Sequence, residues 1–397
     1  MNVVYICYWS VNDPLTISSV MPTLPVLYNR LNPDRVTLIT VERHGTRYPP
    51  FRIPYEFVDH VPITPRFQGL GPLSKVYEMT SVPRQVAKVC ESVGAELLYA
   101  RCSHAGTIAA KIHRRTKVPF VVESFEPHSD YMAGTGTWSR RGLKYRYAKK
   151  YERLQMRDAQ HLITVTNGYR DHLRDIEGVP EERLSVIPCT TDLVKGRFDA
   201  AARREIRDRL DLGSAVTGVY AGKFGDLYYD DEAFRILADG FQFFDDFRVL
   251  LLTPDDPDQL YSRLLRQGID QSRVFVGLVP TDEVPAYLSA ADFAYSFVRP
   301  TPAGPFQCPI KHGEYWAAGL PFMTPARISD DHEVIRDSGG GALLAHDLSN
   351  LRECHEEIGG IISQEGYRAR VQQLAQKFKG RDLIDEALES VFRGPTR

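Results

Sequence analysis

Short apolar runs alternate with segments of helical periodicity along the whole chain. The runs are continuous in Val, Ile and Leu, a pattern typical of parallel strands that are covered on both faces. We therefore predict an α/β fold. The predicted strands lie at 3–9, 35–42, 96–101, 119–125, 161–166 and 184–189, and then at 216–222, 247–254, 273–279, 291–297, 320–325 and 341–345.

Helical patterns fill many of the intervals between these strands. They lie at 104–116, 139–157, 168–176, 230–240, 257–267, 282–290 and 310–318. The strand–helix rhythm runs twice, and 397 residues are too many for one ordinary core. We predict two Rossmann-like, doubly wound domains, 1–195 and 196–397, whose strand ends face a central cleft. The last helical stretch, 381–392, has no strand after it and can pack on either domain.

The composition is that of a globular protein, with 43% hydrophobic and 25% charged residues. No apolar run approaches the roughly 20 residues of a membrane-spanning helix. The N-terminus lacks the basic segment and cleavage site of a signal peptide. The six cysteines are scattered without a CxxC pair, which favours a reducing compartment over a disulfide framework or a structural zinc site. We expect a cytoplasmic protein without a cofactor.

Charge is distributed unevenly between the halves. Residues 1–195 carry 26 Lys and Arg against 19 Asp and Glu, a balance of +7, and the remainder carries 23 against 32, a balance of −9. The first half should therefore attract anionic surfaces or substrates. No nucleic-acid-binding motif accompanies this charge, so we expect no nucleic-acid partner.

Much of the excess charge lies in 139–157, which holds eight basic residues and one acid, Glu152. Leu143, Tyr147, Tyr151 and Leu154 form one stripe at helical spacing. In one interpretation the stripe packs on the sheet and the basic residues are a solvated face. In the other, the basic face docks on anionic lipid headgroups and holds the protein at the inner face of a membrane.

Two loops that follow strands of the second half carry candidate anion-binding residues. Gly222 and Lys223 follow the strand at 216–222 and suit a phosphate, although an ordinary turn with an exposed lysine is the alternative. In "GPFQCPIKHGEYWAAGLPF", Pro309 favours a helix start, Lys311 supplies a cation, and Glu314 lies one turn further on. Glu314 suits the two hydroxyls of a ribose, or it only complements the helix dipole.

The first half offers weaker candidates. Glu126 and His128 follow the strand at 119–125, where an imidazole and a carboxylate suit proton transfer or contacts to a substrate hydroxyl; a solvated loop is the alternative. Asn12 and Asp13 lie in the loop after the first strand, which suits an acceptor or simply precedes a helix. The Asp256-Pro257-Asp258 segment is ordinary turn chemistry, and we predict no metal site.

These elements resemble those of a known enzyme family. "YAGKFGD", "VFVGLVPTDEVPAYLSAADFAYSF" and "CPIKHGEYWAAGLPF" resemble retaining glycosyltransferases of the GT-B fold, most like glycosyltransferase family 4, and the resemblance extends over essentially the whole chain. It implies transfer of a sugar from a nucleotide-sugar donor, such as a UDP- or GDP-sugar, without an essential metal. The implied acceptor is a glycan, a lipid-linked glycan or a small molecule.

The resemblance also implies roles for individual residues. Glu314 matches the ribose-binding glutamate, Lys223 and Lys311 match the diphosphate-binding cations, and His128 matches a histidine near the transferred sugar. The base and sugar regions correspond to Leu278, Val279, Phe306 and Pro309.

One departure from the family pattern is that Phe306 stands where the family often has a glutamate, eight positions before the ribose glutamate. A second is that no basic residue follows Lys223 at the usual spacing, so more of the leaving-group charge falls to Lys311. Two alternatives share the fold: a sugar-nucleotide epimerase, and a non-catalytic nucleotide-sugar-binding protein.

Overall fold

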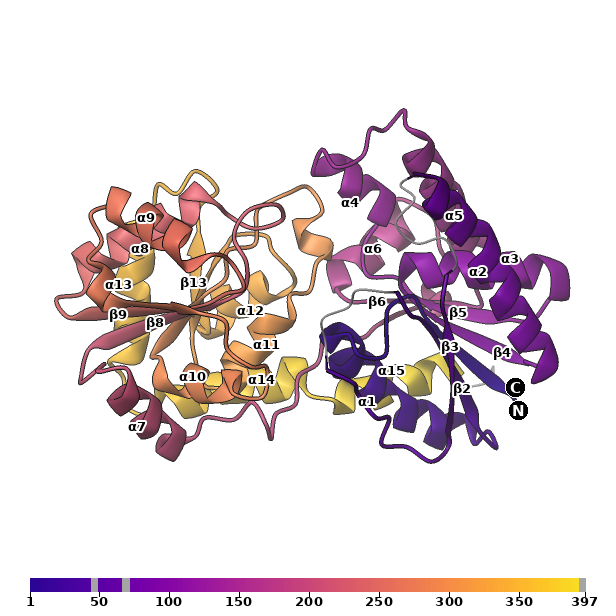
Figure 1. The fold of residues 1–397 in the computed structure, drawn as a ribbon, viewed down its shortest axis with the longest axis horizontal. Coiled ribbons are helices and arrows are strands. Elements are labelled where there is room, and N and C mark those ends of the chain that lie inside the picture. The colour runs from indigo at the N-terminus through magenta and orange to yellow at the C-terminus, as the bar shows by residue number, and fades with distance from the viewer. Residues whose placement is uncertain (44–48, 66–71, 393–397) are drawn as a thin grey trace. The chain divides into compact units, whose positions relative to one another are not determined.

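The structure is a computed structural model that describes residues 1–43, 49–65 and 72–392. The chain forms two compact units, Met1–Pro188 with Arg381–Arg397, and Cys189–Gly380. Each unit is built on a parallel sheet flanked by helices (Figure 1). This confirms the predicted α/β fold with two Rossmann-like domains. The N-terminal segment of the first unit ends at Pro188, a few residues before the division that the sequence predicts after residue 195.

The sheet of the first unit has seven parallel strands in the order β3-β2-β1-β4-β5-β6-β7. The strands are β1 (Val3–Cys7), β2 (Val36–Val41), β3 (Val58–Ile63), β4 (Leu97–Arg101), β5 (Phe120–Glu123), β6 (His161–Thr164) and β7 (Leu184–Val186). Four of the five inner strands, β1, β2, β5 and β6, are buried along their whole length, as their continuous apolar runs predict.

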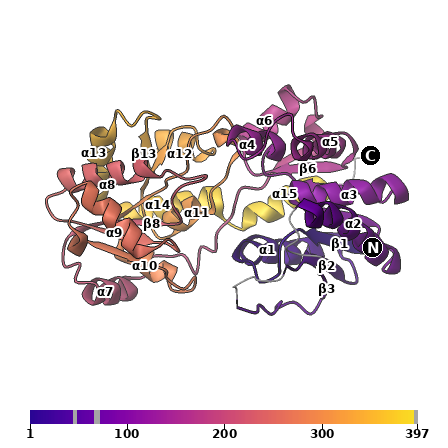
Figure 2. The same ribbon diagram turned by 45° about the horizontal axis from the view of Figure 1, so that its top comes forward.

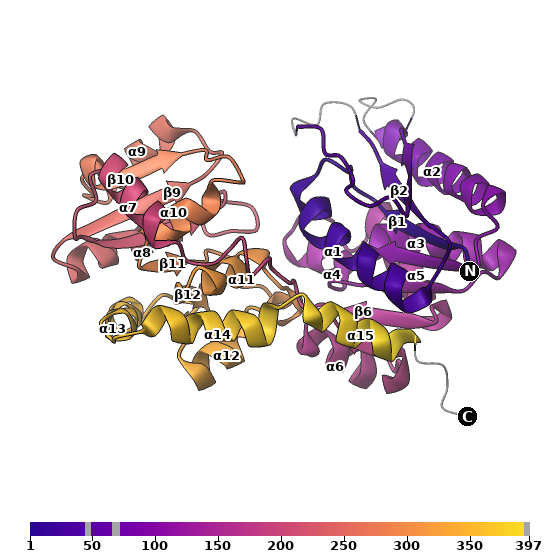
Figure 3. The same cartoon turned by 90° about the horizontal axis from the view of Figure 1, so that it is seen from below.

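The helices of the first unit are α1 (Pro14–Leu31), α2 (Pro72–Ser92), α3 (Cys102–Thr116), α4 (His128–Gly134), α5 (Leu143–Asp158), α6 (Asn167–Asp175) and α15 (Asp382–Phe392). Helix α5 packs against both α3 and α4 (Figure 2). The C-terminal α15 lies beside α1 (Figure 3), where Ile384, Leu388 and Val391 join the core of this unit. The last helix therefore belongs to the first unit.

The sheet of the second unit has six parallel strands in the order β10-β9-β8-β11-β12-β13. The strands are β8 (Val216–Ala221), β9 (Phe247–Leu252), β10 (Val274–Gly277), β11 (Phe293–Tyr295), β12 (Phe322–Pro325) and β13 (Gly341–Leu344). The helices are α7 (Ala200–Arg209), α8 (Asp231–Phe243), α9 (Pro257–Arg266), α10 (Val284–Ala290), α11 (Ile310–Ala317), α12 (Asp331–Ser338), α13 (Leu351–Ile362) and α14 (Tyr367–Lys379).

Two hydrophobic cores cover the faces of this second sheet. Residues of α8, α9 and α13 pack on one face, and residues of α7, α10, α11 and α14 pack on the other (Figure 1). All twelve predicted strands contain a strand of the structure. Among the described residues, the strand that was not predicted is β3, an edge strand whose sequence VDHVPI is interrupted by Asp59 and His60 and is buried only at Ile63.

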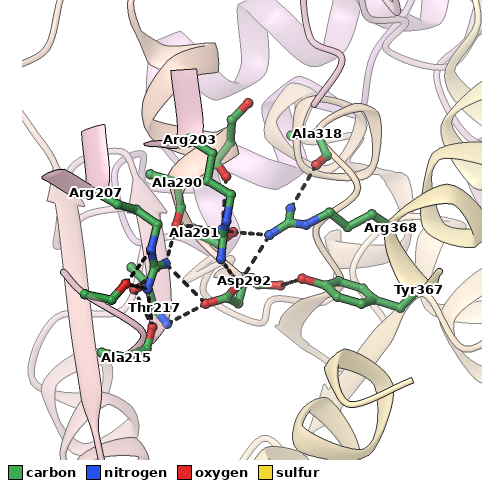
Figure 4. Close-up of polar contacts among 12 residues, drawn as sticks. Arg203, Arg207, Ala215, Thr217, Ala290, Ala291, Asp292, Ala318, Tyr367 and Arg368 are labelled. Carbon is green, nitrogen blue, oxygen red and sulfur yellow. Dashed lines mark hydrogen bonds and ion pairs between the residues drawn. The ribbon is translucent and has the colours of Figure 1, made fainter. Parts of the chain in front are cut away.

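A polar cluster ties the sheet of the second unit to its helices (Figure 4). The Asp292 carboxylate accepts hydrogen bonds from Arg203 at 2.8 Å, from Arg368 at 3.3 Å and from the Thr217 backbone N–H at 2.9 Å. Arg203, Arg207 and Arg368 also donate to carbonyl oxygens of residues 289–291 at the end of α10. These guanidinium groups therefore satisfy the last carbonyls of a helix and hold α7 and α14 in place.

The chain enters and leaves the second unit at neighbouring points. The Thr191 backbone N–H, near the start of this unit, donates to the carbonyl oxygen of Lys379, the last residue of α14, at 2.9 Å. The second unit is thus a continuous segment whose two ends are joined by a hydrogen bond.

Candidate functional site

The strand order of the second unit reverses between β8 and β11, the two central strands of the sheet. In open parallel sheets, ligands bind outside the carboxyl ends of the strands at such a point. Lys223 follows β8 and Lys311 follows β11. Both predicted diphosphate-binding lysines therefore lie in chain segments that leave the sheet at its switch point.

Lys311 is a buried cation in the first turn of α11. Its Nζ forms no hydrogen bond with any residue that the structure describes. Instead, Nζ lies 4.8 Å from the ring centre of Tyr220 and 4.5 Å from that of Tyr228, and both ring faces attract a cation. Burial lowers the pKa of Lys311 to about 8, although the nearby Glu314 charge opposes this shift. The ammonium group is thus held in place but unsatisfied.

Gly222 makes room for this ammonium group. A Cβ atom at position 222 would lie 2.7 Å from Lys311 Nζ and 2.8 Å from the Tyr220 hydroxyl oxygen. Both distances are shorter than van der Waals contact, so a side chain would displace one of these groups. The predicted Gly222 and Lys311 are therefore brought together in the structure, and the Tyr220 hydroxyl fixes the turn by donating to the Lys223 carbonyl oxygen at 2.6 Å.

Glu314 lies one helical turn after Lys311 and is partly buried. Burial raises the pKa of Glu314, and the charge of Lys311 partly offsets the shift. Within the described parts of the chain, its carboxylate forms no hydrogen bond or ion pair. Lys311 and Glu314 are therefore two opposite charges close to each other, and both retain hydrogen-bonding capacity for a ligand.

Lys223 and Arg299 have weak partners of their own. Lys223 Nζ lies 2.9 Å from the Asp226 carboxylate, and both side chains are exposed. Arg299 Nη1 lies 3.2 Å from the Glu232 carboxylate. Exposed ion pairs contribute about 0–1 kcal/mol, so an anionic ligand can compete for either cation.

The segment before α11 forms a short turn. Gly304–Phe306 form a 3-10 turn, in which the backbone N–H groups of Phe306 and Gln307 donate to the carbonyls of Ala303 and Gly304. Pro309 is the N-cap residue of α11 and not its first helical residue. The backbone amides of 306 and 307 are therefore engaged in the turn and are not free for a ligand.

Leu278 and Val279 follow β10. The Leu278 side chain is 76% exposed, unusual for a leucine, whereas Val279 is buried. An exposed apolar side chain directly after a sheet strand offers a flat contact for a planar ligand group.

In the first unit, His128 is the first residue of α4. Its Nδ1 lies 2.9 Å from the Glu126 carboxylate, which orients the ring. Burial disfavours the charged imidazole, but the hydrogen bond and charge of Glu126 outweigh it and raise the pKa of His128. The two predicted residues therefore form a carboxylate–imidazole pair, the arrangement used for proton transfer.

The aromatic neighbours of His128, which are His104 and Trp138, were not predicted, and neither was Tyr8, which contacts His104. His104, in the first turn of α3, lies edge-on to the His128 ring with 4.9 Å between ring centres, and it stacks on Tyr8 at 4.7 Å. Tyr8 follows β1 and His104 follows β4, the central strands of this sheet. The position of both residues directly after a strand was a signal that could have identified them.

A buried carboxylate fixes the start of α4. Glu152 of α5 accepts hydrogen bonds from the Ser129 backbone N–H at 2.8 Å and from the Ser129 hydroxyl at 2.5 Å. This acid, the only one within 139–157, therefore faces α4 and anchors the residue next to His128.

Asn12 and Asp13 have local partners. The Asn12 side-chain oxygen accepts a hydrogen bond from the Phe51 backbone N–H at 2.7 Å, and Asp13 caps α1 by accepting from the Leu15 N–H at 2.8 Å. Both contacts stabilise the loop after β1.

Helix α5 exposes most of its basic side chains. Lys149 is the exception, since it pairs with Asp130 at 2.8 Å. Tyr147 and Tyr151 pack near Lys111 of α3, whereas Leu143 is 83% exposed and does not continue the packed stripe. The exposed basic residues of this region are Arg140, Arg141, Lys144, Arg146, Lys150, Arg153 and Arg157.

Neither a metal site nor a membrane-spanning helix is found in the described residues. Within them, no group of three or more His, Cys, Asp or Glu side chains could hold a metal ion. Asp256 caps α9 by accepting from the N–H groups of Asp258 and Gln259. No helix in these parts of the chain is long and apolar enough to cross a bilayer.

Comparison with known proteins identifies the first unit. Residues 30–190 match the family model described as a glycosyl transferase 4-like domain. Over this segment the chain is similar to glycosyl transferase 4-like domains. The matched segment runs from the end of α1 through β7 and includes Glu126 and His128. No curated protein sequence matches the chain.

Solved structures show that the chain has the GT-B fold. Anabaena HepE, crystallised with UDP and glucose, matches with a TM-score of 0.70 and 16% identity over 98% of both chains. Sucrose-phosphate synthase from Thermosynechococcus elongatus matches with a TM-score of 0.74 and 14% identity, over 99% of this chain and 98% of that one. WaaG, a glycosyltransferase involved in lipopolysaccharide biosynthesis, matches with a TM-score of 0.69 and 15% identity, over 99% and 100%.

Proposed function

We propose that this protein is a glycosyltransferase that moves a hexose from a nucleoside-diphosphate sugar to a glycan, glycolipid or small-molecule acceptor. The proposal includes retention of the anomeric configuration and no essential metal ion. The observation that carries it is the Lys311 ammonium group, which is buried next to the switch point of the second sheet and has no hydrogen-bond partner among the described residues. A buried cation without a partner is costly unless a ligand anion satisfies it.

The second unit is proposed to bind the donor. Lys311 and Lys223 contact the diphosphate, and Gly222 allows its close approach. Glu314 accepts hydrogen bonds from the ribose hydroxyls. The complexes of HepE with UDP and UDP-glucose make UDP-sugars the first donors to test, with GDP-sugars second.

The base and the sugar are proposed to lie on either side of these groups. Leu278 and Val279 contact the base, and the exposed Leu278 side chain supports this assignment. Phe306 and Pro309 border the donor sugar.

The proposed chemistry is electrostatic. Departure of the nucleoside diphosphate builds negative charge on its oxygens while the anomeric carbon becomes cationic. Lys311 stabilises the leaving group strongly, because a positive charge held in a low-dielectric site needs no reorganisation during the reaction. Lys223 adds a second, solvent-exposed charge once it exchanges Asp226 for the phosphate.

The first unit is proposed to bind the acceptor, with Asn12 and Asp13 in its loop. His128 contacts the transferred sugar or the acceptor hydroxyl, and Glu126 holds its ring. The raised pKa of His128 supports a role in which the imidazole carries a proton or a positive charge.

Nucleotide binding tests the donor assignment. Thermal shift with UDP, UDP-sugars and GDP-sugars should identify the base, because a ligand at a hundred times its dissociation constant adds about 2.7 kcal/mol of stability. Glu314→Gln and Lys311→Ala should each weaken binding by about 1.5–3 kcal/mol, the contribution of a charge-assisted hydrogen bond. The exposed Glu333→Gln and Lys377→Ala are matched controls. Wild-type affinity in both site variants would contradict the assignment.

The reaction itself separates the proposal from its alternatives. Release of nucleoside diphosphate that depends on an acceptor indicates transfer. An altered sugar nucleotide without such release indicates an epimerase, and binding without turnover indicates a binding protein.

His128→Ala should lower turnover far more than it lowers donor affinity. An interaction made mainly in the transition state lowers kcat and leaves KM nearly unchanged. Steady-state kinetics with the donor varied measures both, and unchanged kcat in the folded variant would remove His128 from the reaction.

The exposed basic face of α5 is proposed to dock on anionic lipid headgroups at the cytoplasmic surface of a membrane. Each exposed Lys or Arg near such a surface contributes about 1 kcal/mol. Vesicle sedimentation with neutral and anionic lipids, at low and high salt, measures this. Equal, negligible binding to both lipids would exclude it.

A further inference from the structure

Two cysteines of the second unit lie in contact with each other and with a buried lysine. The Cys308 sulfur accepts a hydrogen bond from the Cys189 backbone N–H at 3.2 Å and from Lys379 Nζ at 3.5 Å. The side chains of the two cysteines also contact each other. None of these three residues has a part in the proposed donor site.

The surroundings of Cys308 favour its thiolate. A neutral thiol is a weak acceptor, whereas two N–H donors, one of them cationic, stabilise a sulfur anion. Lys379 is itself held by the buried Asp331 carboxylate at 2.7 Å, so its ammonium group cannot move away. The hydrogen bond with Cys189 and, against the effect of burial, the charge of Lys379 lower the pKa of Cys308 to about 7.

The four buried cysteines are different, and burial raises the pKa of Cys7 as well as those of the other three. Burial raises the pKa of Cys90 to about 11 and the pKa values of Cys102 and Cys354 to about 12. Cys189 and Cys308 are only partly buried, so a small reagent can reach them.

We propose that Cys308 is a thiol modification site for hydroperoxides, and that Cys189 converts the oxidised product into a disulfide. The Cys308 thiolate attacks one peroxide oxygen of hydrogen peroxide. The O–O bond breaks, hydroxide leaves, and Cys308 becomes a sulfenic acid. The Cys189 thiol then attacks the Cys308 sulfur, an S–S bond forms, and the sulfenic oxygen leaves as water.

This site lies next to the donor helix. Cys308 precedes the N-cap residue of α11, the helix that carries Lys311 and Glu314. Oxidation removes the Cys308 thiolate beside Lys379, leaving Asp331 as its anionic partner, and ties the segment before α11 to the start of the second unit. The modification therefore acts on the backbone that positions the proposed donor-binding residues, and its chemistry does not depend on that function.

Thiol labelling and mass spectrometry of the full-length native protein test the proposal. At pH 7, iodoacetamide should label one thiol at least about tenfold faster than the others, because only thiolates react. Peptide mapping should place this label on Cys308, and Cys308→Ser should lose the fast phase. Cys354→Ser is the matched control and should keep it.

Hydrogen peroxide should remove the mass of two hydrogen atoms from the wild type and link the peptides of Cys189 and Cys308. In Cys189→Ser, dimedone should trap a sulfenic acid on Cys308. A fast phase that persists in Cys308→Ser would overturn the proposal. So would peroxide treatment that gives neither the link in the wild type nor the dimedone adduct in the folded Cys189→Ser variant.

Discussion

Lys311 and Lys379 are two buried cations of the second unit, and their surroundings are opposite. Lys379 Nζ lies 2.7 Å from the Asp331 carboxylate, and Asp331 also contacts His312 at 2.8 Å. Burial disfavours the charged form of Lys379. The negative charges of Asp331 and Cys308 outweigh the effect of burial and raise the pKa of Lys379. Lys311 has two aromatic rings and no hydrogen-bond acceptor among the described residues, and burial lowers its pKa to about 8.

The two surroundings distinguish a charge that stabilises the fold, that of Lys379, from a charge that can interact with a ligand, that of Lys311. A buried ion pair is satisfied by the protein itself, and losing one partner leaves the other uncompensated. A buried cation without an acceptor is stabilised much less by the folded protein than a buried ion pair is. For Lys311, the rings of Tyr220 and Tyr228 each contribute only about 0.5–2 kcal/mol. Lys379 should therefore matter to stability, and Lys311 should matter to binding.

The largest expected effect is the loss of stability in Lys379→Met. The substitution leaves the Asp331 carboxylate buried without its cation, which typically costs about 3–5 kcal/mol. Denaturant unfolding measures the cost, and hydrogen exchange in α11 and α14 assigns it to the second unit. The exposed Lys377→Met on the same helix is the control. A loss no larger than that of the control would remove the structural role of the pair.

Lys311→Met is expected to have a smaller effect on stability. In contrast to Lys379→Met, it should not lower the free energy of unfolding at pH 7. Between pH 8 and 10.5 the unfolded chain keeps the Lys311 proton and the folded chain loses it. The free energy of unfolding of the wild type should therefore rise with pH across this window relative to the variant, because the unfolded state binds more protons.

Lys223→Met serves as the exposed control for this comparison. A parallel pH dependence of wild type and Lys311→Met would show that Lys311 is not a depressed, buried cation.

The smallest expected effect is that of Tyr228→Leu. Removing one ring face from the Lys311 ammonium should cost about 0.5–1 kcal/mol, or a two- to fivefold weaker UDP affinity. The loss should be larger at pH 8 than at pH 7, because the variant holds the Lys311 proton less firmly. Isothermal titration at both pH values measures this, and an equal loss at both would assign the ring to direct ligand contact.

Features that depend on neighbouring residues in the chain, such as strands and helices, can be predicted from the sequence. Continuous apolar runs locate twelve strands, and the pattern after Pro309 locates helix α11, on which Lys311 and Glu314 lie one turn apart. Strand β3 escapes prediction because an edge strand needs no continuous apolar run, and its VDHVPI sequence even contains a proline.

The contrast between the two lysines is not local. Asp331 and Lys379 are distant in the sequence, and so are Tyr228 and Lys311. Whether a lysine has a carboxylate or a ring beside it depends on how the helices pack. The stack of Tyr8 on His104 is hidden for the same reason.

The hydrogen bond between Thr191 and Lys379 has a consequence for protein engineering. A continuous segment with adjoining ends, Cys189–Gly380, has the form of a domain inserted into a host. It should be possible to express this segment alone, because both its sheet and its two cores lie within it. The first unit cannot be expressed as one continuous segment of the chain, because its helix α15 follows the second unit in the sequence. A version without the second unit needs a short linker from Pro188 to Arg381.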